Sequence, residues 1–275
     1  MNISNLFWVL FILMAFQPYF QKKIMETMRQ RKIAQIEKEN GSRVILLVHR
    51  QETMSFLGFP LIRYIDINDS EEVLRAIQLT DDSVPLDIIL HTPGGMVIAA
   101  TQIARAIKAH PGKVTVFVPH FAMSGGTLIA LAADEIRMCE HSALGPIDPQ
   151  LGTQPAASLK KVIEQKPIEK IDDTTLVLAD MGAKAIDQIR ETAMKLLEGT
   201  MEPEGARTLA TTLSEGKWTH DYPIFADEAL ALGLKINTDM PNAVLEMMSL
   251  YPQPTKSIPS VEYLPDPHRS TPVKG

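Results

Sequence analysis

The sequence predicts an α/β fold in which parallel strands alternate with helices. Four short runs are apolar and rich in β-branched residues, which is typical of strands that are buried on both faces. Segments with apolar residues at helical spacing separate these runs, and such alternation is the pattern of parallel βαβ units. The predicted strands are Arg43–His49, Leu86–Leu90, Lys113–Val118 and Glu135–Cys139.

Residues 1–21 are predicted to form a transmembrane anchor. Ile3 to Phe20 is almost wholly apolar and carries no charged side chain over 18 residues, a length at the short end for a bilayer span. A cleaved signal peptide is the alternative, but residues 1–5 lack a basic start and Gln17–Phe20 is a poor cleavage site. We therefore expect an uncleaved, single-pass anchor in the cell membrane.

Residues 22–41 are predicted to form a helical stalk, because Lys22 to Asn40 contains no Pro or Gly. Basic residues that follow an anchor favour a cytoplasmic location for the domain behind them. Those nearest the bilayer are placed to meet anionic lipid, so membrane lipid is an expected partner. These basic residues are Lys22, Lys23, Arg29, Arg31 and Lys32.

Residues 42–240 are predicted to form one domain. Two stretches, Gln51–Asp66 and Ser142–Pro155, lack clear periodicity and are expected as loops. The expected helices are 71–78, which follows a start signal at Asn68–Ser70, then 96–109, 125–133, 172–197, 204–213 and 226–232, the last ended by Gly233. Residues 241–275 are expected to be a Pro-rich disordered tail, since the part from Tyr251 holds six of the 19 prolines.

Two Gly-containing turns stand between an apolar run and an Ala-rich helical run, at His91–Gly95 and at Phe121–Gly126. Each turn places backbone N–H groups at the start of a helix, where they favour negative charge. The second turn also carries a hydroxyl, that of Ser124. A nucleophile together with donors for an oxyanion is what acyl transfer needs.

Composition excludes several other classes of protein. The net charge of −6 gives no support to nucleic-acid binding. A single cysteine, Cys139, allows no intrachain disulfide and no Cys cluster for zinc, and we expect it to be a buried, inert thiol. No dinucleotide fingerprint or P-loop occurs, so we expect no cofactor and no metal.

Four ordered segments resemble the Clp/crotonase fold, which is built from repeated ββα units. They are Asp87–Gly95, Ala122–Ile136, Ser142–Gln150 and Gly216–Asp221. Within that fold, residues 43–238 are similar to membrane serine peptidases of the signal peptide peptidase A type and to the serine dehydrogenase proteinase family. The resemblance implies a peptidase with Ser124 as nucleophile and the N–H groups of Gly95 and Gly125 as oxyanion hole. It also implies a peptide or membrane-protein substrate and a homo-oligomeric assembly.

A serine at neutral pH needs a general base, and the sequence leaves three candidates. The His that cytosolic Clp-type peptidases carry about twenty-five residues after the Ser is absent, since that count reaches Asp148 and Pro149. The membrane peptidases use a Ser–Lys dyad, and Lys166 and Lys170 fall in the window that this resemblance implies. His220 is the alternative, because Asp221 beside it could orient its ring.

Two other functions fit the same residues. The two turns also suit a crotonase-like CoA-binding protein, which would polarise a thioester without a Ser nucleophile. They also suit a catalytically inactive scaffold, in which the glycines only let a strand enter a helix tightly. The sequence favours the serine endopeptidase.

Overall fold

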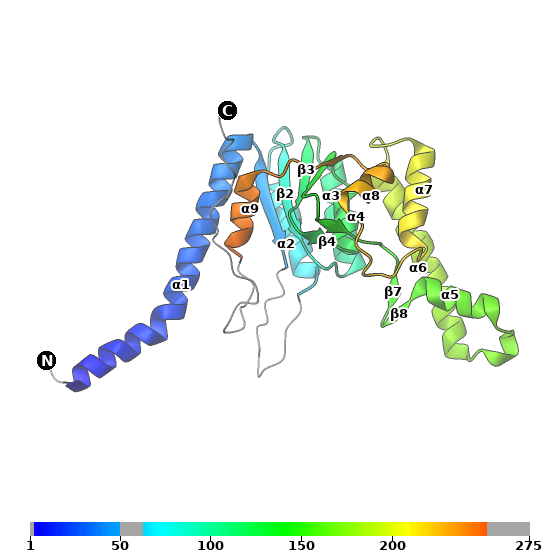
Figure 1. Ribbon diagram of the computed structural model, residues 1–275, viewed down its shortest axis with the longest axis horizontal. Coiled ribbons are helices and arrows are strands. Elements are labelled where there is room, and N and C mark those ends of the chain that lie inside the picture. The colour runs from blue at the N-terminus through cyan, green and yellow to red at the C-terminus, as the bar shows by residue number, and fades with distance from the viewer. Residues whose placement is uncertain (1–2, 50–62, 252–275) are drawn as a thin grey trace, which may run out of the picture.

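The computed structural model describes residues 3–49 and 63–251, and Figure 1 shows their arrangement around one central sheet. The sheet has five parallel strands in the order β1-β2-β3-β5-β9. Their bounds are β1 Arg43–Val48, β2 Leu86–His91, β3 Val114–Val118, β5 Glu135–Met138 and β9 Ile236–Asn237. The prediction of an α/β fold with parallel strands is confirmed.

Both faces of the sheet are covered, which explains why the central strands read as continuous apolar runs. Ile88 and Leu90 of β2 belong to the larger core, to which three helices, α2, α3 and α4, contribute. Ile89, between them in sequence, points to the opposite face and packs in a second core. Every residue of β2 and β3 is buried. The three helices of the larger core named above are α2 Ile67–Gln78, α3 Val97–Ala109 and α4 Gly125–Ala130.

The second core joins the two ends of the described chain. Helix α1, Ile3–Asn40, contributes Ile36, and helix α9, Asn242–Ser249, contributes Val244 and Met247. Both lie against strand residues that include Ile89 and Phe117, and Figure 1 shows α1 and α9 together at one end of the sheet. The tail predicted over 241–275 therefore begins with a packed helix. Its part from residue 252 lies outside the described residues.

The predicted membrane anchor needs correction. Helix α1 runs without interruption from the apolar start into the charged stalk, and Phe16, Tyr19 and Phe20 are exposed. Among the residues that the structure describes, no helix is both long enough and apolar enough to cross a bilayer. The apolar run was already at the short end for a span, and Gln17 and Pro18 lower its apolar character further. The predicted transmembrane helix and the single-pass membrane localisation are therefore wrong, and the cytoplasmic placement of the domain, which was argued from that anchor, loses its basis.

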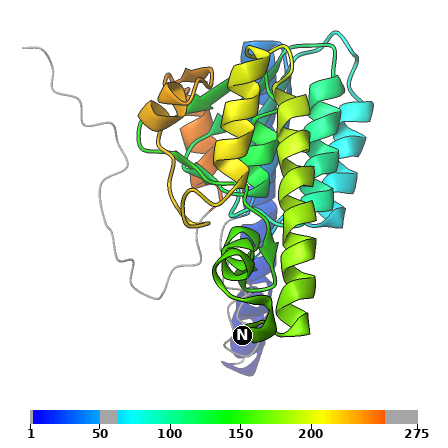
Figure 2. The ribbon, with the colours of Figure 1, turned by 90° about the vertical axis from the view of Figure 1, so that its right-hand side faces the viewer.

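A helical arm projects from the sheet beside the larger core. Helix α5, Ala156–Gln165, is followed by the short 3-10 helix η1, Ile168–Lys170, and by α6, Asp173–Leu197. Figures 1 and 2 show α5 packed along the first turns of α6, below the level of the sheet. The last turns of α6 return to the core with Ala193 and Leu196. Helix α7, Pro203–Ser214, packs beside α6, and α8, Ala226–Ala231, leads into β9.

Two small two-stranded sheets lie outside the central sheet. Strand β4, Phe121–Ala122, pairs in parallel with β6, Ala143–Leu144, and directly precedes α4. Strands β7, Gln150–Leu151, and β8, Gln154–Pro155, form a small antiparallel hairpin. The stretch 142–155, expected as a loop, therefore contains three short strands, whose two-residue length is too small for a periodic pattern to reveal.

Candidate active site

Ser124 stands between β4 and α4 in a conformation that few residues adopt. It is the residue that precedes the helix, with φ 51° and ψ −116°. Among the described residues it is the one non-glycine with a positive φ. Such a conformation costs on the order of 1–3 kcal/mol and occurs mostly at functional sites, where the surrounding structure enforces it. A sharp strand-to-helix turn of this kind also exposes the serine hydroxyl.

The Thr92–Gly95 turn lies directly against this serine. A Cβ at Gly94 would meet the Cβ of Ser124 at 2.8 Å and the carbonyl oxygen of Met123 at 2.9 Å. Gly94 also has φ +105°, which L side chains rarely adopt. Only glycine at this position therefore allows the two turns to approach so closely.

Gly95 and Gly125 line the same cavity as Ser124. A Cβ at Gly125 would lie 3.6 Å from the Gly95 nitrogen, so the two backbones are neighbours. Within the described part of the chain, neither amide donates a hydrogen bond. Two unused N–H donors beside a serine are the arrangement that an oxyanion hole requires.

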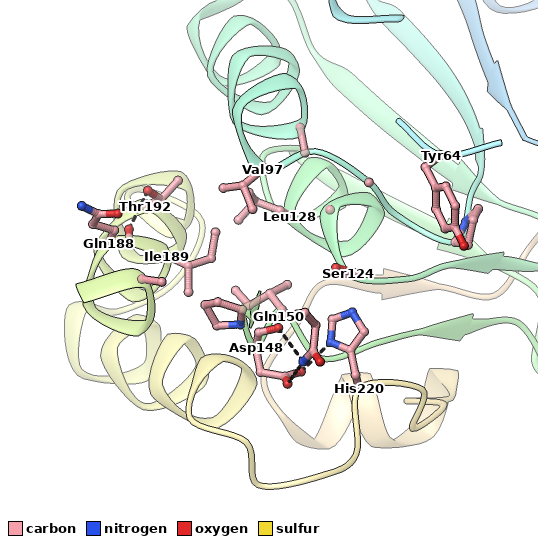
Figure 3. A pocket seen from close by; sticks show the side chains of 17 residues that line it. Tyr64, Val97, Ser124, Leu128, Asp148, Gln150, Gln188, Ile189, Thr192 and His220 are labelled. Carbon is pink, nitrogen blue, oxygen red and sulfur yellow. Dashed lines mark hydrogen bonds and ion pairs between the residues drawn. The ribbon is translucent and has the colours of Figure 1, made fainter. Parts of the chain in front are cut away.

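Ser124 opens into a cavity of about 600 Å³ between α3, α4 and α6, which Figure 3 shows. Most of its lining is apolar, and the polar groups gather near Ser124 and on α6. The lining residues are Tyr64, Pro93, Gly95, Val97, Ala100, Ser124, Gly125, Leu128, Ile147, Asp148, Pro149, Gln150, Ala185, Gln188, Ile189, Thr192 and His220. A cavity of this size, apolar with a few convergent polar groups, is typical of ligand sites.

His220 and Asp148 form a hydrogen-bonded pair in the wall of this cavity. His220 Nδ1 lies 2.8 Å from Asp148 Oδ1, and the Asp148 side chain is 2% exposed. The Gln150 amide donates to Asp148 Oδ2 at 2.6 Å and fixes the carboxylate from its other side. A carboxylate only accepts, so Nδ1 carries the hydrogen and Nε2 can accept a proton. In Figure 3 the ring of His220 lies between Asp148 and Ser124.

The structure separates the three candidate bases. His220 lines the same cavity as Ser124, whereas Lys166 and Lys170 do not. Both lysines are exposed, one at the end of α5 and the other in η1. The carboxylate that orients His220 is that of Asp148, not that of the exposed Asp221.

In the sequence, Asp148 was noted only because it lies where cytosolic Clp-type peptidases carry their histidine. No sequence feature connected this residue with His220. The two are 72 residues apart, so no local spacing links them. The one available signal was that Asp148 lies in a segment of the family resemblance, flanked by Ile147 and Pro149 in otherwise apolar surroundings. A buried carboxylate needs a partner, and that requirement could have directed attention to it. Within the described residues, no group of three or more His, Cys, Asp or Glu side chains could hold a metal ion.

Comparison with known proteins places the chain among proteinases. A sequence model of the ClpP-like SDH-type serine proteinases matches residues 1–274. Two uncharacterized proteins of Methanocaldococcus jannaschii, MJ0137 and MJ1495, are 48% and 46% identical to it. The alignments cover 96% and 98% of this chain, and 92% of each relative.

Two solved structures are similar at lower identity. A serine-to-alanine mutant of the 1510-N membrane-bound stomatin-specific protease is 22% identical, with a TM-score of 0.46 over 67% of this chain and 79% of that one. ClpP1 from Listeria monocytogenes is 16% identical, with a TM-score of 0.46 over 76% of this chain and 98% of that one.

Proposed function

Because the chain belongs to the family of ClpP-like SDH-type serine proteinases, we propose that it hydrolyses peptide bonds with Ser124 as nucleophile and His220 as general base. The observation that carries the proposal is the position of the His220–Asp148 pair in the wall of the cavity that holds Ser124. The strained backbone at Ser124 supports it, since the fold maintains that conformation at a cost in stability.

The proposed reaction begins with proton transfer from the Ser124 hydroxyl to Nε2 of His220. The serine oxygen then bonds to the carbonyl carbon of the scissile peptide, and the carbonyl oxygen becomes an oxyanion. The N–H groups of Gly95 and Gly125 donate to this oxygen. When the carbon–nitrogen bond breaks, His220 returns its proton to the leaving amine, and the acyl group stays on Ser124.

Hydrolysis of the acyl group repeats the same steps with water. His220 accepts a proton from the water molecule while the water oxygen attacks the acyl carbon. The proton then passes to the Ser124 oxygen as the carboxylic acid product leaves. Asp148 accepts the hydrogen of Nδ1, so that Nε2 faces the reaction at each step. Gln150 keeps the carboxylate in place for this task.

A histidine base accounts for the site better than a Ser–Lys dyad. A lysine is a base at neutral pH only where burial lowers its pKa, and the exposed positions of Lys166 and Lys170 supply no such burial. The structure contains no hydrogen bond between Ser124 and His220 within its described residues. Such contacts are often longer without substrate and shorten when substrate binds.

The substrate that the cavity suits is a peptide with an apolar side chain next to the scissile bond. Leu128 and Ile189 form part of the apolar wall, and Gln188 and Thr192 add polar groups at a distance from Ser124 in Figure 3. Assembly into homo-oligomers stays a prediction from the family resemblance.

Labelling with a fluorophosphonate tests the nucleophile directly. The label forms a bond to an activated serine, and mass spectrometry of the digested protein locates it. We expect label on Ser124, none in Ser124→Ala, and a rate that falls about 100-fold or more in His220→Ala. Lys166→Ala and Lys170→Ala should keep the wild-type rate.

Two results would contradict the proposal in different ways. Folded wild-type protein that takes no label at Ser124 would favour a scaffold or a CoA-binding role over a peptidase. Loss of labelling in a lysine variant, with His220→Ala unaffected, would move the base to that lysine. Circular dichroism of each variant establishes that the fold is intact.

A further inference from the structure

A second His–Asp pair, His49 and Asp69, contacts the Thr92–Gly95 turn from outside the cavity lining. His49, which follows β1, places Nε2 3.2 Å from Asp69 Oδ2 in the first turn of α2. Its other ring nitrogen, Nδ1, lies 2.9 Å from the hydroxyl oxygen of Thr92. His49 is 4% exposed and Thr92 is fully buried, so the bond between these two side chains is shielded from bulk water.

The carboxylate fixes the direction of the bonds in this chain. Asp69 only accepts, so Nε2 of a neutral His49 carries the hydrogen and Nδ1 accepts from the Thr92 hydroxyl. The oxygen of that hydroxyl then accepts the N–H of Gly94, at 3.2 Å. The same hydroxyl has a longer, 3.4 Å contact with the Gly94 carbonyl oxygen, which is its alternative acceptor. The chain of bonds therefore ends on the residue next to Gly95.

The turn is also held at its other end, by Ile65. The Ile65 N–H donates to the Gly94 carbonyl oxygen at 2.8 Å, and the Met96 N–H donates to the Ile65 carbonyl oxygen at 2.8 Å. These two bonds bracket Gly95, which lines the cavity and whose own N–H donates no hydrogen bond within the part of the chain that the structure describes. A Cβ at Gly95 would overlap the Ile65 backbone at 2.3 Å, so the contact is as close as a glycine permits.

Asp69 connects the two ends of the turn. Asp66, the residue after Ile65, caps α2 by accepting the Asp69 N–H at 3.1 Å. Asp69 Oδ2 in return accepts the Asp66 N–H at 2.9 Å, and the same oxygen receives His49. The Asp69 carboxylate thus holds Asp66, next to the residue that pairs with Gly94 and Met96. It also holds His49, which contacts Thr92.

The ionisation of Asp69 agrees with this arrangement. Burial raises the pKa of this carboxyl, but the hydrogen bond from His49, the one from the Asp66 backbone, and the positive charge of Arg63 outweigh it. The net result is a lowered pKa. The carboxylate therefore stays charged and keeps its role as acceptor at neutral pH.

We infer that His49 and Asp69 are positioning residues, which set the orientation of the Gly95 N–H toward the substrate oxyanion through Thr92 and Ile65. The inference rests on the proposed peptidase function. Neither residue lines the cavity, so both act on catalysis only through the turn. Loss of either residue should weaken the stabilisation of the transition state and leave the binding of substrate unchanged.

Four variants and one matched control test the inference. Asp69→Asn and His49→Gln break the pair, and Thr92→Val removes the hydroxyl with almost no change of shape. Loss of an oxyanion donor costs about 100- to 1,000-fold in kcat, and a displaced donor should cost less, about 10- to 100-fold. Thr92→Ser keeps the hydroxyl and should restore most of the rate. The control Asp172→Asn makes the same chemical change at the start of α6, where Asp172 caps Thr175, and should leave kcat unchanged.

The readouts separate positioning from general damage to the fold. With a peptide ester substrate, KM should stay within about twofold while kcat falls. A peptide aldehyde, which forms a tetrahedral adduct with serine, should bind more weakly in proportion to the loss of kcat/KM. Equal kcat in Asp69→Asn, Thr92→Val and wild type would overturn the inference, as would a rise in KM alone. If Thr92→Val does not fold, the comparison of Thr92→Ser with His49→Gln carries the test. Wild-type protein that neither labels nor hydrolyses would instead refute the proposed function itself.

Discussion

The carboxylate of Asp148 lies 2.8 Å from Nδ1 of His220, although 72 residues separate them in the sequence. Asp148 precedes the β7–β8 hairpin, and His220 lies in the connection between α7 and α8. The fold therefore completes the pair only when the helical arm and α7 have packed on the core. A site built from such distant segments depends on the whole domain.

Replacement of Asp148 should show whether this pair acts in catalysis. Asp148→Asn can donate to Nδ1, which then places the hydrogen on Nε2, the wrong nitrogen for a base. We expect kcat for a peptide ester to fall on the order of 1,000-fold or more, with little change in KM. Asp221→Asn, next to His220 but exposed, is the control and should retain full activity. An active Asp148→Asn enzyme would show that the pair is only structural.

Replacement of Gly94 should damage the site more than its backbone angle alone explains. In Gly94→Ala the new Cβ would meet Ser124 and the Met123 carbonyl below 3 Å. We expect a loss of about 2–4 kcal/mol in the free energy of unfolding, measured in urea, and no labelling of Ser124. Gly199→Ala is the matched control, since Gly199 also has a positive φ but has nothing within 4 Å of a Cβ. Its cost should be about 1 kcal/mol, and its labelling should be normal.

Stability at acidic pH should depend on Glu135 of β5, whose carboxylate accepts from Asn237 of β9 and from Lys113, the residue before β3. The hydrogen bond from Lys113 at 2.5 Å is the largest cause that lowers its pKa, from 4.5 to about 2, and bonds from Asn237 and Arg137 add to it against the effect of burial. Because the folded-state pKa is depressed, the stabilisation is present above pH 4.5 and is lost as the pH falls toward 2.

Glu135→Gln should therefore lower the free energy of unfolding by about 2 kcal/mol at pH 7, and the difference from wild type should shrink below pH 4. Urea unfolding at pH 7, 5 and 3 measures it. The control Glu164→Gln breaks only an exposed contact with Lys160 at 4.0 Å and should have little effect at any of these pH values. If the free energies of unfolding of Glu135→Gln and wild type differ by the same amount at all three pH values, the ionisation of Glu135 is not the cause of the stabilisation.

Filling the cavity should change selectivity without touching the chemistry. Ala185 on α6 lines it, and Ala185→Trp should occupy part of the space for an apolar substrate side chain. We expect KM for peptides with a large apolar residue to rise about 10-fold or more, while a small fluorophosphonate labels Ser124 at the wild-type rate. Lys184→Trp, at an exposed neighbouring position outside the cavity, should leave KM unchanged. Parallel loss of labelling in Ala185→Trp would indicate a distorted site instead.

The sequence predicted those parts of the fold that depend on local chemistry. The runs that became β2 and β3 are apolar because both faces of the sheet are covered, and Gly94, Gly95 and Ser124 stand in turns that only certain residues can form. Contacts between distant segments were not predicted. The partner of His220 and the packing of α9 on α1 depend on tertiary structure, and helix α5 has no strong boundary signal beyond Pro155. The apolar start of α1 resembled a membrane anchor because composition alone does not distinguish a membrane-spanning segment from the apolar end of another helix.

The packing of α9 has a consequence for synthesis of the chain. Val44, Ile89 and Phe117 all belong to segments made early, yet their shared face is closed by Val244, Met247 and Met248. As the ribosome releases the chain from its N-terminus, this apolar face stays uncovered until residues near 249 have emerged. The last described helix therefore completes the domain, and the nascent protein is most exposed to aggregation just before that moment.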